Sequence, residues 1–108
     1  MFTASDHATL SGDWQWFLDV VGPALEGGPG GLIDDDLAYV APWGFQPSDV
    51  KAPVLLPHGG ADRIAPFGHG EWLARRIATA ELRAYPEDGH ISILRHGESV
   101  LEWLAEHA

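Results

Sequence analysis

The sequence has no cysteine, and this absence excludes disulfide bonds, thiolate metal sites and a cysteine nucleophile. Basic residues are also scarce, because 6 Lys and Arg stand against 16 Asp and Glu and leave a net charge of −10. Phosphate groups require a basic surface, so this balance argues against nucleic acids and anionic membranes as partners. No apolar run approaches the ~18 residues that a transmembrane helix needs.

The start of the chain lacks a basic segment followed by a long apolar stretch, so it does not have the pattern of a signal peptide. The sequence therefore predicts a cytoplasmic location. With 45% hydrophobic residues, the chain is too apolar to be disordered on composition alone. Its 108 residues allow at most one domain of ordinary size.

The first half of the chain has a helical pattern. Residues 1–10 are expected to form a mobile lead, followed by a helix over 11–26 with Ser11 as its N-cap. Apolar side chains recur at helical spacing in this segment: Trp14, Phe17, Leu18 and Val21. A second helix is expected over 32–41, after a glycine-rich run. The three aspartates near its start, Asp34 to Asp36, are interpreted as solvated residues that the helix dipole favours.

The second half alternates between strand and helix patterns. A short apolar run at 53–58 predicts a fully buried strand, and the alternation at 81–85 predicts a second strand. Residues 68–78 between them have a helical pattern. A last helix is expected to present Val100, Leu101 and Leu104 on one face. The strand–helix–strand–helix order predicts an α/β unit with two parallel strands.

Two polar residues follow these strands closely. Asp62 lies in the loop after the first strand, and His90 lies in the turn after the second. Parallel neighbouring strands place their following loops at the same edge of a sheet, where ligand and catalytic groups gather in α/β proteins. A carboxylate beside a histidine can fix the imidazole tautomer while the other ring nitrogen accepts a proton from a nucleophile. The sequence therefore predicts that Asp62 and His90 form such a pair.

Two segments resemble the α/β-hydrolase family. Ala52 to Pro66, with His58-Gly59-Gly60-Ala61-Asp62, resembles the family's acid-bearing segment, and Ala80 to His90 resembles the strand and loop that carry its histidine. The resemblance implies an α/β-hydrolase core portion at 50–108, preceded at 1–49 by a lead and a helical cap remnant. It implies hydrolysis of an ester, amide or similar bond, with Asp62 as triad acid, His90 as triad base and no cofactor.

The chain departs from this family in one large respect. The family's nucleophile stands on a G-x-S-x-G turn, which none of the five serines matches. The sequence therefore predicts a C-terminal fragment of such a hydrolase, inactive alone, which would act on a small-molecule substrate only when completed by the missing part. Two strands with a bare face and edge also predict that the helices at 11–26 and 32–41 cover the open face, or that the chain self-associates or pairs with the missing half.

Other interpretations of the same residues stay open. An alternative is a non-catalytic binding module that pairs with itself or a partner through its sheet edge. Asp62 can be a turn former and His90 a turn histidine bonded to backbone. His58 and His69 could join Asp62 as metal ligands, although their spacing matches no known metal site, and no metal is expected.

The aromatic and acidic residues near the candidate pair also allow more than one role. The tryptophans Trp14, Trp16 and Trp43 could line a substrate pocket or pack in a core, and Trp72 and Trp103 are expected to pack helices on the sheet. Glu87 and Asp88 carry negative charges, and they are expected to interact electrostatically with the His90 imidazole if they lie close to it.

Overall fold

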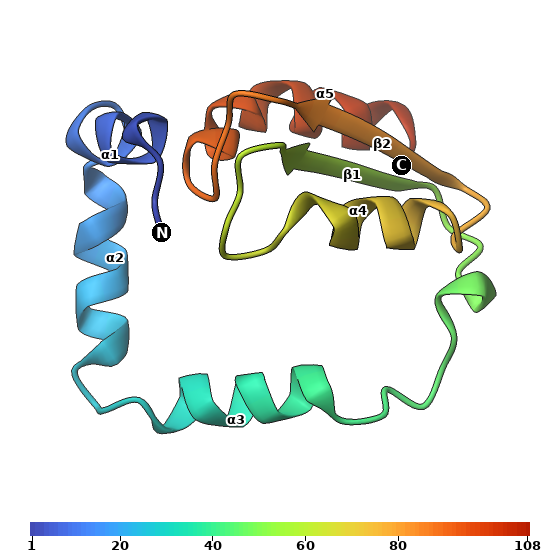
Figure 1. The fold of residues 1–108 in the computed structure, drawn as a ribbon, viewed down its shortest axis with the longest axis horizontal. Coiled ribbons are helices and arrows are strands. Elements are labelled where there is room, and N and C mark those ends of the chain that lie inside the picture. The colour runs from blue at the N-terminus through green and yellow to red at the C-terminus, as the bar shows by residue number, and fades with distance from the viewer.

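The computed structural model describes residues 1–108 and has mixed α/β architecture. The α/β unit contains β1 (Val54–Gly59), α4 (Phe67–Ala74), β2 (Ala80–Tyr85) and α5 (Gly97–Glu106). Three helices precede it, and they are α1 (Ala4–Ser11), α2 (Trp16–Leu25) and α3 (Gly30–Val40). Two short 3-10 helices, η1 (Pro47–Asp49) and η2 (Ser92–His96), complete the chain. Figure 1 shows α4 and α5 on opposite sides of the two strands.

The sheet consists of β1 and β2 in parallel, as the sequence predicts. Val54 pairs with Ala80 at one end, and Gly59 pairs with Tyr85 at the other. The crossover helix α4 contacts both strands. This register brings the carboxyl ends of β1 and β2 side by side, so the loops that follow them leave from one edge.

The prediction of a fully buried first strand is wrong, because every residue of β1 except Gly59 is only half-buried. A sheet of two strands has an open edge on each strand, and two short helices cannot enclose both of its faces. The buried apolar residues are Ile77, Ile91 and Trp103. In α5, Trp103 is therefore the residue that packs inward as expected, whereas Leu101 and Leu104, predicted on the packed face, are 68% and 51% exposed.

The N-terminal residues form a helix rather than a mobile lead. Thr3 caps α1 in a capping box, in which its hydroxyl accepts from the Asp6 amide and the Asp6 carboxylate accepts from the Thr3 amide. Ser11 is the last residue of α1 and not the N-cap of the next helix, which begins at Trp16. The helix predicted over 11–26 is thus divided by a turn that contains Trp14, and α2 continues two residues past Pro23.

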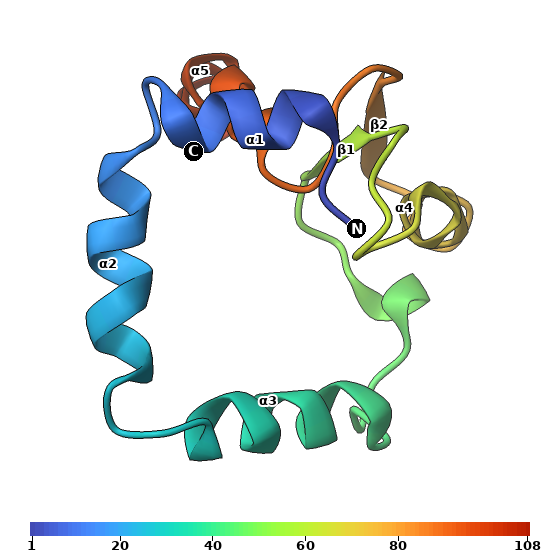
Figure 2. The same cartoon turned by 60° about the vertical axis from the view of Figure 1, so that its left-hand side comes forward.

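The helices α2 and α3 do not cover the open face of the sheet, so the prediction that the two helices of the first half fold over it is wrong. Neither helix buries a single residue, and Figure 2 shows both extending away from the strands as an arc. Apolar side chains such as Leu18, Leu37 and Val40 are 51%, 60% and 82% exposed. The three aspartates of α3 lie in its interior rather than its first turn, because the helix begins earlier, at Gly30. No helix has both the length and the apolar character to cross a membrane.

Candidate active site

The structure brings Asp62 and His90 together at the carboxyl edge of the sheet. Asp62 lies in the loop between β1 and α4, and His90 lies in the loop between β2 and η2. His90 Nδ1 is 2.9 Å from Asp62 Oδ2, within hydrogen-bond distance. The residues are 28 positions apart in the sequence, so the parallel register of the strands creates this contact.

The Asp62 carboxylate is fixed from its other side by backbone. Its Oδ1 accepts from the amides of Ile64 and Ala65 at 2.8 and 2.9 Å, in a turn closed by the side chain. The side chain of Asp62 is only 6% exposed. Burial alone would raise the pKa of Asp62, but the hydrogen bonds from His90, Ala65 and Ile64 outweigh burial and hold this pKa below its usual value. Asp62 is therefore a rigid anionic acceptor for the imidazole.

The His90 ring lies at the edge of a small hollow and keeps one nitrogen away from Asp62. The hollow measures ≈ 220 Å³ and is lined by Pro57, His58, Gly59, Asp62, Ala65, His90 and Ile93. The His90 side chain is 40% exposed, so molecules in solution can reach it. A carboxylate on Nδ1 favours the proton on that nitrogen and leaves Nε2 as a proton acceptor. The arrangement can therefore orient a general base.

Two glycines allow the loops after β1 and β2 to approach each other. Gly60 donates its amide to the Tyr85 carbonyl at 2.8 Å, and Ala61 donates to the Asp88 carbonyl at 3.0 Å. A Cβ on Gly59 would overlap the Asp88 carbonyl, and a Cβ on Gly60 would lie 2.8 Å from Cα of Pro86. The absence of side chains at both glycines thus sets the distance between the acid loop and the histidine loop.

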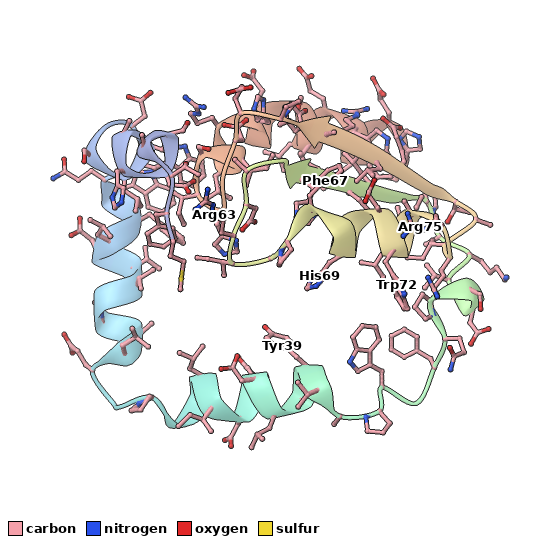
Figure 3. All side chains as sticks on the ribbon, viewed as in Figure 1. Tyr39, Arg63, Phe67, His69, Trp72 and Arg75 are labelled. Atoms are coloured by element: carbon pink, nitrogen blue, oxygen red, sulfur yellow. The ribbon has the colours of Figure 1, made fainter.

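His58 and His69 do not join Asp62 in a metal site. His58 Nε2 is 2.7 Å from the Ala65 carbonyl, and its ring lies against Gly70 of α4, so His58 fastens the acid loop. His69 is on the exposed side of α4, and Figure 3 shows it pointing with Trp72 toward the space in front of Tyr39. No group of three or more His, Cys, Asp or Glu residues lies close enough to hold a metal ion.

The tryptophans do not line the hollow beside His90. Trp14 is half-buried and Trp16 is 53% exposed, with their rings 5.3 Å apart. Trp43 lines a separate hollow of ≈ 470 Å³ with Gly68, His69, Trp72 and Leu73. Trp72 is 40% exposed, and the guanidinium of Arg76 lies 3.8 Å above its ring, so the prediction that Trp72 packs on the sheet is wrong.

Asp88 serves the histidine loop but does not hydrogen-bond His90. Its carboxylate pairs with Arg95 and with His96 Nε2, each at 2.7 Å. Burial would raise the pKa of Asp88, but these partners and Ser92 keep it below the usual value. Asp88 therefore does not pair with His90 as expected. Its carboxylate instead connects the loop after β2 to η2, which contains Arg95 and His96.

Asp6 is a residue at this site that sequence reasoning missed. Its side chain is fully buried against the segment that follows His90, and it accepts from the amides of Ile91 and Ser92. Burial would raise the pKa of Asp6, but the backbone hydrogen bonds from Ser92, Thr3 and Ile91 lower it to about 2. The Thr3-x-x-Asp6 capping pattern was the available signal for a helix start here, but nothing in the sequence indicated the distant partners.

Comparisons with known proteins give partial matches to hydrolases. No family model matches the chain, and no solved structure matches it significantly. A pimeloyl-acyl-carrier protein methyl ester esterase of Aromatoleum aromaticum is 39% identical over 56 residues, which are 52% of this chain and 22% of that protein. The corresponding esterase of Chromobacterium violaceum is 36% identical over 58 residues, 54% of this chain and 23% of the relative.

A longer match extends over most of the chain. The AB hydrolase superfamily protein YisY of Bacillus subtilis is 31% identical over an alignment of 99 positions, which covers 85% of this chain and 34% of that protein. The chain thus spans between about a fifth and a third of the length of these curated relatives. What YisY shares with this chain includes much of the helical first half as well as the α/β unit, since a match over 85% of the chain cannot fit into the second half alone.

Proposed function

We propose, since this chain is related to the α/β-hydrolase family, that Asp62 and His90 are the acid and the histidine of a hydrolytic triad. Residues 50–108 then correspond to a C-terminal core portion of that fold, and residues 1–49 to a lead and helical cap. The observation that carries the proposal is the 2.9 Å contact between Asp62 Oδ2 and His90 Nδ1, with the second carboxylate oxygen fixed by two backbone amides.

The chemistry follows from this orientation. His90 Nε2 takes the proton of a nucleophilic hydroxyl as its oxygen attacks the carbonyl carbon of the substrate. The imidazolium that forms is stabilised by the Asp62 carboxylate, and it gives the proton to the leaving group as the acyl bond breaks. Water then attacks the acyl group left on the nucleophile, with His90 again accepting the proton, and this step releases the acid and restores the nucleophile. Asp62 remains ionised throughout, which its lowered pKa and its three hydrogen bonds favour. The triad needs no cofactor.

The nucleophile and the oxyanion donors come from outside these 108 residues in this proposal. No serine stands in a G-x-S-x-G sequence, and Ser92, the serine closest in sequence to His90, is fully buried and accepts from the Gly89 amide. Triads that lose the nucleophile retain only weak catalysis, which rests on the oxyanion hole and the binding site. The 108 residues alone are therefore expected to show no turnover that depends on His90.

The substrate class follows from the relatives named above. Two of them are named as methyl ester esterases, and an ester carbonyl is a normal substrate for a nucleophile–His–Asp triad. We therefore assign the complete site to hydrolysis of a carboxylic ester of a small molecule, with an amide or similar acyl bond as the wider class. We further propose that the protein acts in the cytoplasm.

The test is an assay with an activated aryl ester, first on the 108 residues alone and then on the product of a reading frame that adds a G-x-S-x-G segment upstream. We expect turnover above buffer only in the second case. His90→Ala should abolish it, whereas the matched change His69→Ala on exposed α4 should preserve it. Turnover by the 108 residues that disappears in His90→Ala, or turnover of the longer product that survives it, would contradict the proposal.

A second function, self-association as a non-catalytic module, is favoured by a separate observation. Each strand has one unpaired edge, and α2 and α3 bury none of their apolar side chains. Exposed strand edges and apolar helix faces are the surfaces that copies of a chain use to pair. In this alternative a second copy of this chain covers these surfaces. The mass of the protein in solution, measured by light scattering, tests it.

A further inference from the structure

Asp6 connects the first helix to the backbone on both sides of the candidate catalytic histidine. Its Oδ1 accepts from the amides of Ile91 and Ser92, both at 2.8 Å, while Oδ2 accepts from the Thr3 amide at 2.8 Å. The residue is 1% exposed, so water does not compete for these bonds. A buried carboxylate with three backbone donors is a strong, directional anchor.

The anchor touches both residues next to His90. Ile91, which follows His90, donates directly to Asp6. Gly89, which precedes His90, lies so close that a Cβ there would overlap the Asp6 carboxylate. The Gly89 amide donates to the Ser92 hydroxyl at 2.9 Å, which closes the segment into a tight turn. The backbone of His90 is thus held between two contacts with one carboxylate.

His90 depends on this backbone for its direction. The ring makes one hydrogen bond, to Asp62, and its side chain is 40% exposed. A single bond to a half-exposed ring fixes a distance but not the full orientation, and small errors in the position of a catalytic base reduce rates strongly. A second contact between α1 and this region, from Arg95 Nη2 to Ser5 Oγ at 3.1 Å, lies farther along η2 and does not touch the residues beside His90.

From these contacts we infer that Asp6 is a positioning residue for His90: its buried carboxylate holds the Gly89–Ser92 turn and thereby aims the imidazole at Asp62. The inference rests on the proposed function for its catalytic meaning. It assigns the helix α1, which lies at the other end of the sequence, a direct part in building the site.

The test uses the isotopically labelled 108-residue chain and two magnetic-resonance measurements. The first is the low-field signal of the proton on His90 Nδ1, which reports its bond to Asp62. The second is the hydrogen-exchange rate of the Ile91 and Ser92 amides, with the Gly60 amide, bonded to Tyr85, as a reference for the intact sheet edge. Asp35→Asn on exposed α3 is the matched control.

In Asp6→Ala we expect the Ile91 and Ser92 amides to exchange roughly tenfold to a hundredfold faster and the His90 Nδ1 signal to weaken, with Gly60 unchanged. Asp6→Asn should show smaller changes in the same direction, because a neutral acceptor bonds more weakly than a carboxylate. A merely structural role would leave the His90 signal at its parent strength in every variant whose Gly60 protection is intact.

The inference is overturned if Asp6→Ala keeps the Gly60 protection and also the parent His90 signal. Should Asp6→Ala unfold, Asp6→Asn decides the matter by the same comparison. Absence of the His90 Nδ1 signal in the parent chain would instead refute the Asp62–His90 pair, and with it the proposed function. The exchange rates at Ile91 and Ser92 would still show whether Asp6 holds the turn, so the two failures are distinguishable.

Discussion

Asp62 uses its two carboxylate oxygens for different tasks. Oδ1 accepts from the backbone of its own loop, and Oδ2 meets the imidazole of His90. An asparagine can keep the first task, because its carbonyl oxygen can accept from the same amides. It fails at the second, since its NH₂ group donates where His90 Nδ1 also carries its proton. The electrostatic role and the turn-forming role are therefore separable by one substitution.

Asp62→Asn is expected to invert the tautomer of neutral His90. With an amide donor facing Nδ1, that nitrogen becomes an acceptor and the proton moves to Nε2, where it blocks the base function. The ¹⁵N shifts of the two ring nitrogens, measured at a pH where the ring is neutral, report the tautomer directly. Asp35→Asn should leave them unchanged, and an Asp62→Asn chain with parent shifts would show that Asp62 does not control the ring.

The stability of the fold should fall in acid through Asp6. Its pKa is lowered from the ordinary 3.8 to about 2 in the folded chain, so the unfolded chain binds the proton more readily. The resulting stabilisation, about 2 kcal/mol, is fully present above pH ~4 and is lost as the pH falls toward 2. Asp62 and Asp88, whose pKa values are also lowered, act in the same direction.

Urea unfolding at several pH values between 2 and 6 measures this effect. The parent chain should lose stability steeply below pH 4, and Asp6→Asn should show a flatter curve from a lower plateau, because the carboxylate that titrates has been removed. The exposed Asp35→Asn chain should keep the parent slope. Identical slopes in the parent and Asp6→Asn would mean that the Asp6 carboxylate does not contribute in this pH range.

At the scale of elements, the distance between the acid loop and the histidine loop depends on Gly59. Gly59→Ala would force its new Cβ against the Asp88 carbonyl, so the loops must separate at a cost of about 1–3 kcal/mol. A Cβ added to Gly68, in the first turn of α4, would meet no atom within 4 Å, and Gly68→Ala should be neutral or stabilising by up to ~1 kcal/mol. Thermal unfolding of both variants compares them, and equal stability would contradict the tight approach.

The sequence was most informative where local pattern and topology coincide. The apolar run of β1, the alternation of β2 and the helix between them predict parallel strands, and these in turn predict that Asp62 and His90 meet. The burial of β1 was overestimated because a strand pattern does not reveal how many neighbours the strand has. Periodicity likewise predicted that Leu101 and Leu104 share the packed face of α5, but both are exposed, and only the prediction for Trp103, whose large ring packs inward, is confirmed.

The helix α1 shows the other limit of sequence reasoning. Its capping pattern lies in the sequence, but the contacts that make Asp6 important are with amides 85 and 86 residues away. Backbone amides have no sequence signature, so a carboxylate that binds them cannot be paired by inspection. For the same reason His58 was open to interpretation as a metal ligand, although it bonds the Ala65 carbonyl.

At the scale of the whole molecule, the arc of α2 and α3 carries apolar residues without cover, and self-association is the expected result. Light scattering should give a mass above 11.7 kDa that rises with protein concentration. Because the net charge of −10 makes copies repel one another, added salt should increase the mass further. Replacing Leu37 and Val40 with glutamine should reduce it.

The control for this prediction is Glu102→Gln on exposed α5, which lowers the repulsion without removing an apolar side chain and should not reduce the mass. A parent chain that stays at 11.7 kDa at high concentration and high salt would exclude pairing through these helices. An increased mass that is unaffected by the glutamine variants would point instead to the unpaired strand edges.

The bonds from Asp6 to Ile91 and Ser92 have a consequence for the order of assembly. The bond to Ile91 closes a loop between residues 85 positions apart. During translation the Asp6 carboxylate therefore stays solvated until Ile91 and Ser92 have left the ribosome. Contacts this distant along a chain form late, because the entropy of closing the loop opposes them. The turn around His90 therefore becomes rigid only when α1 docks against it, after the local contacts of the strand pair have formed.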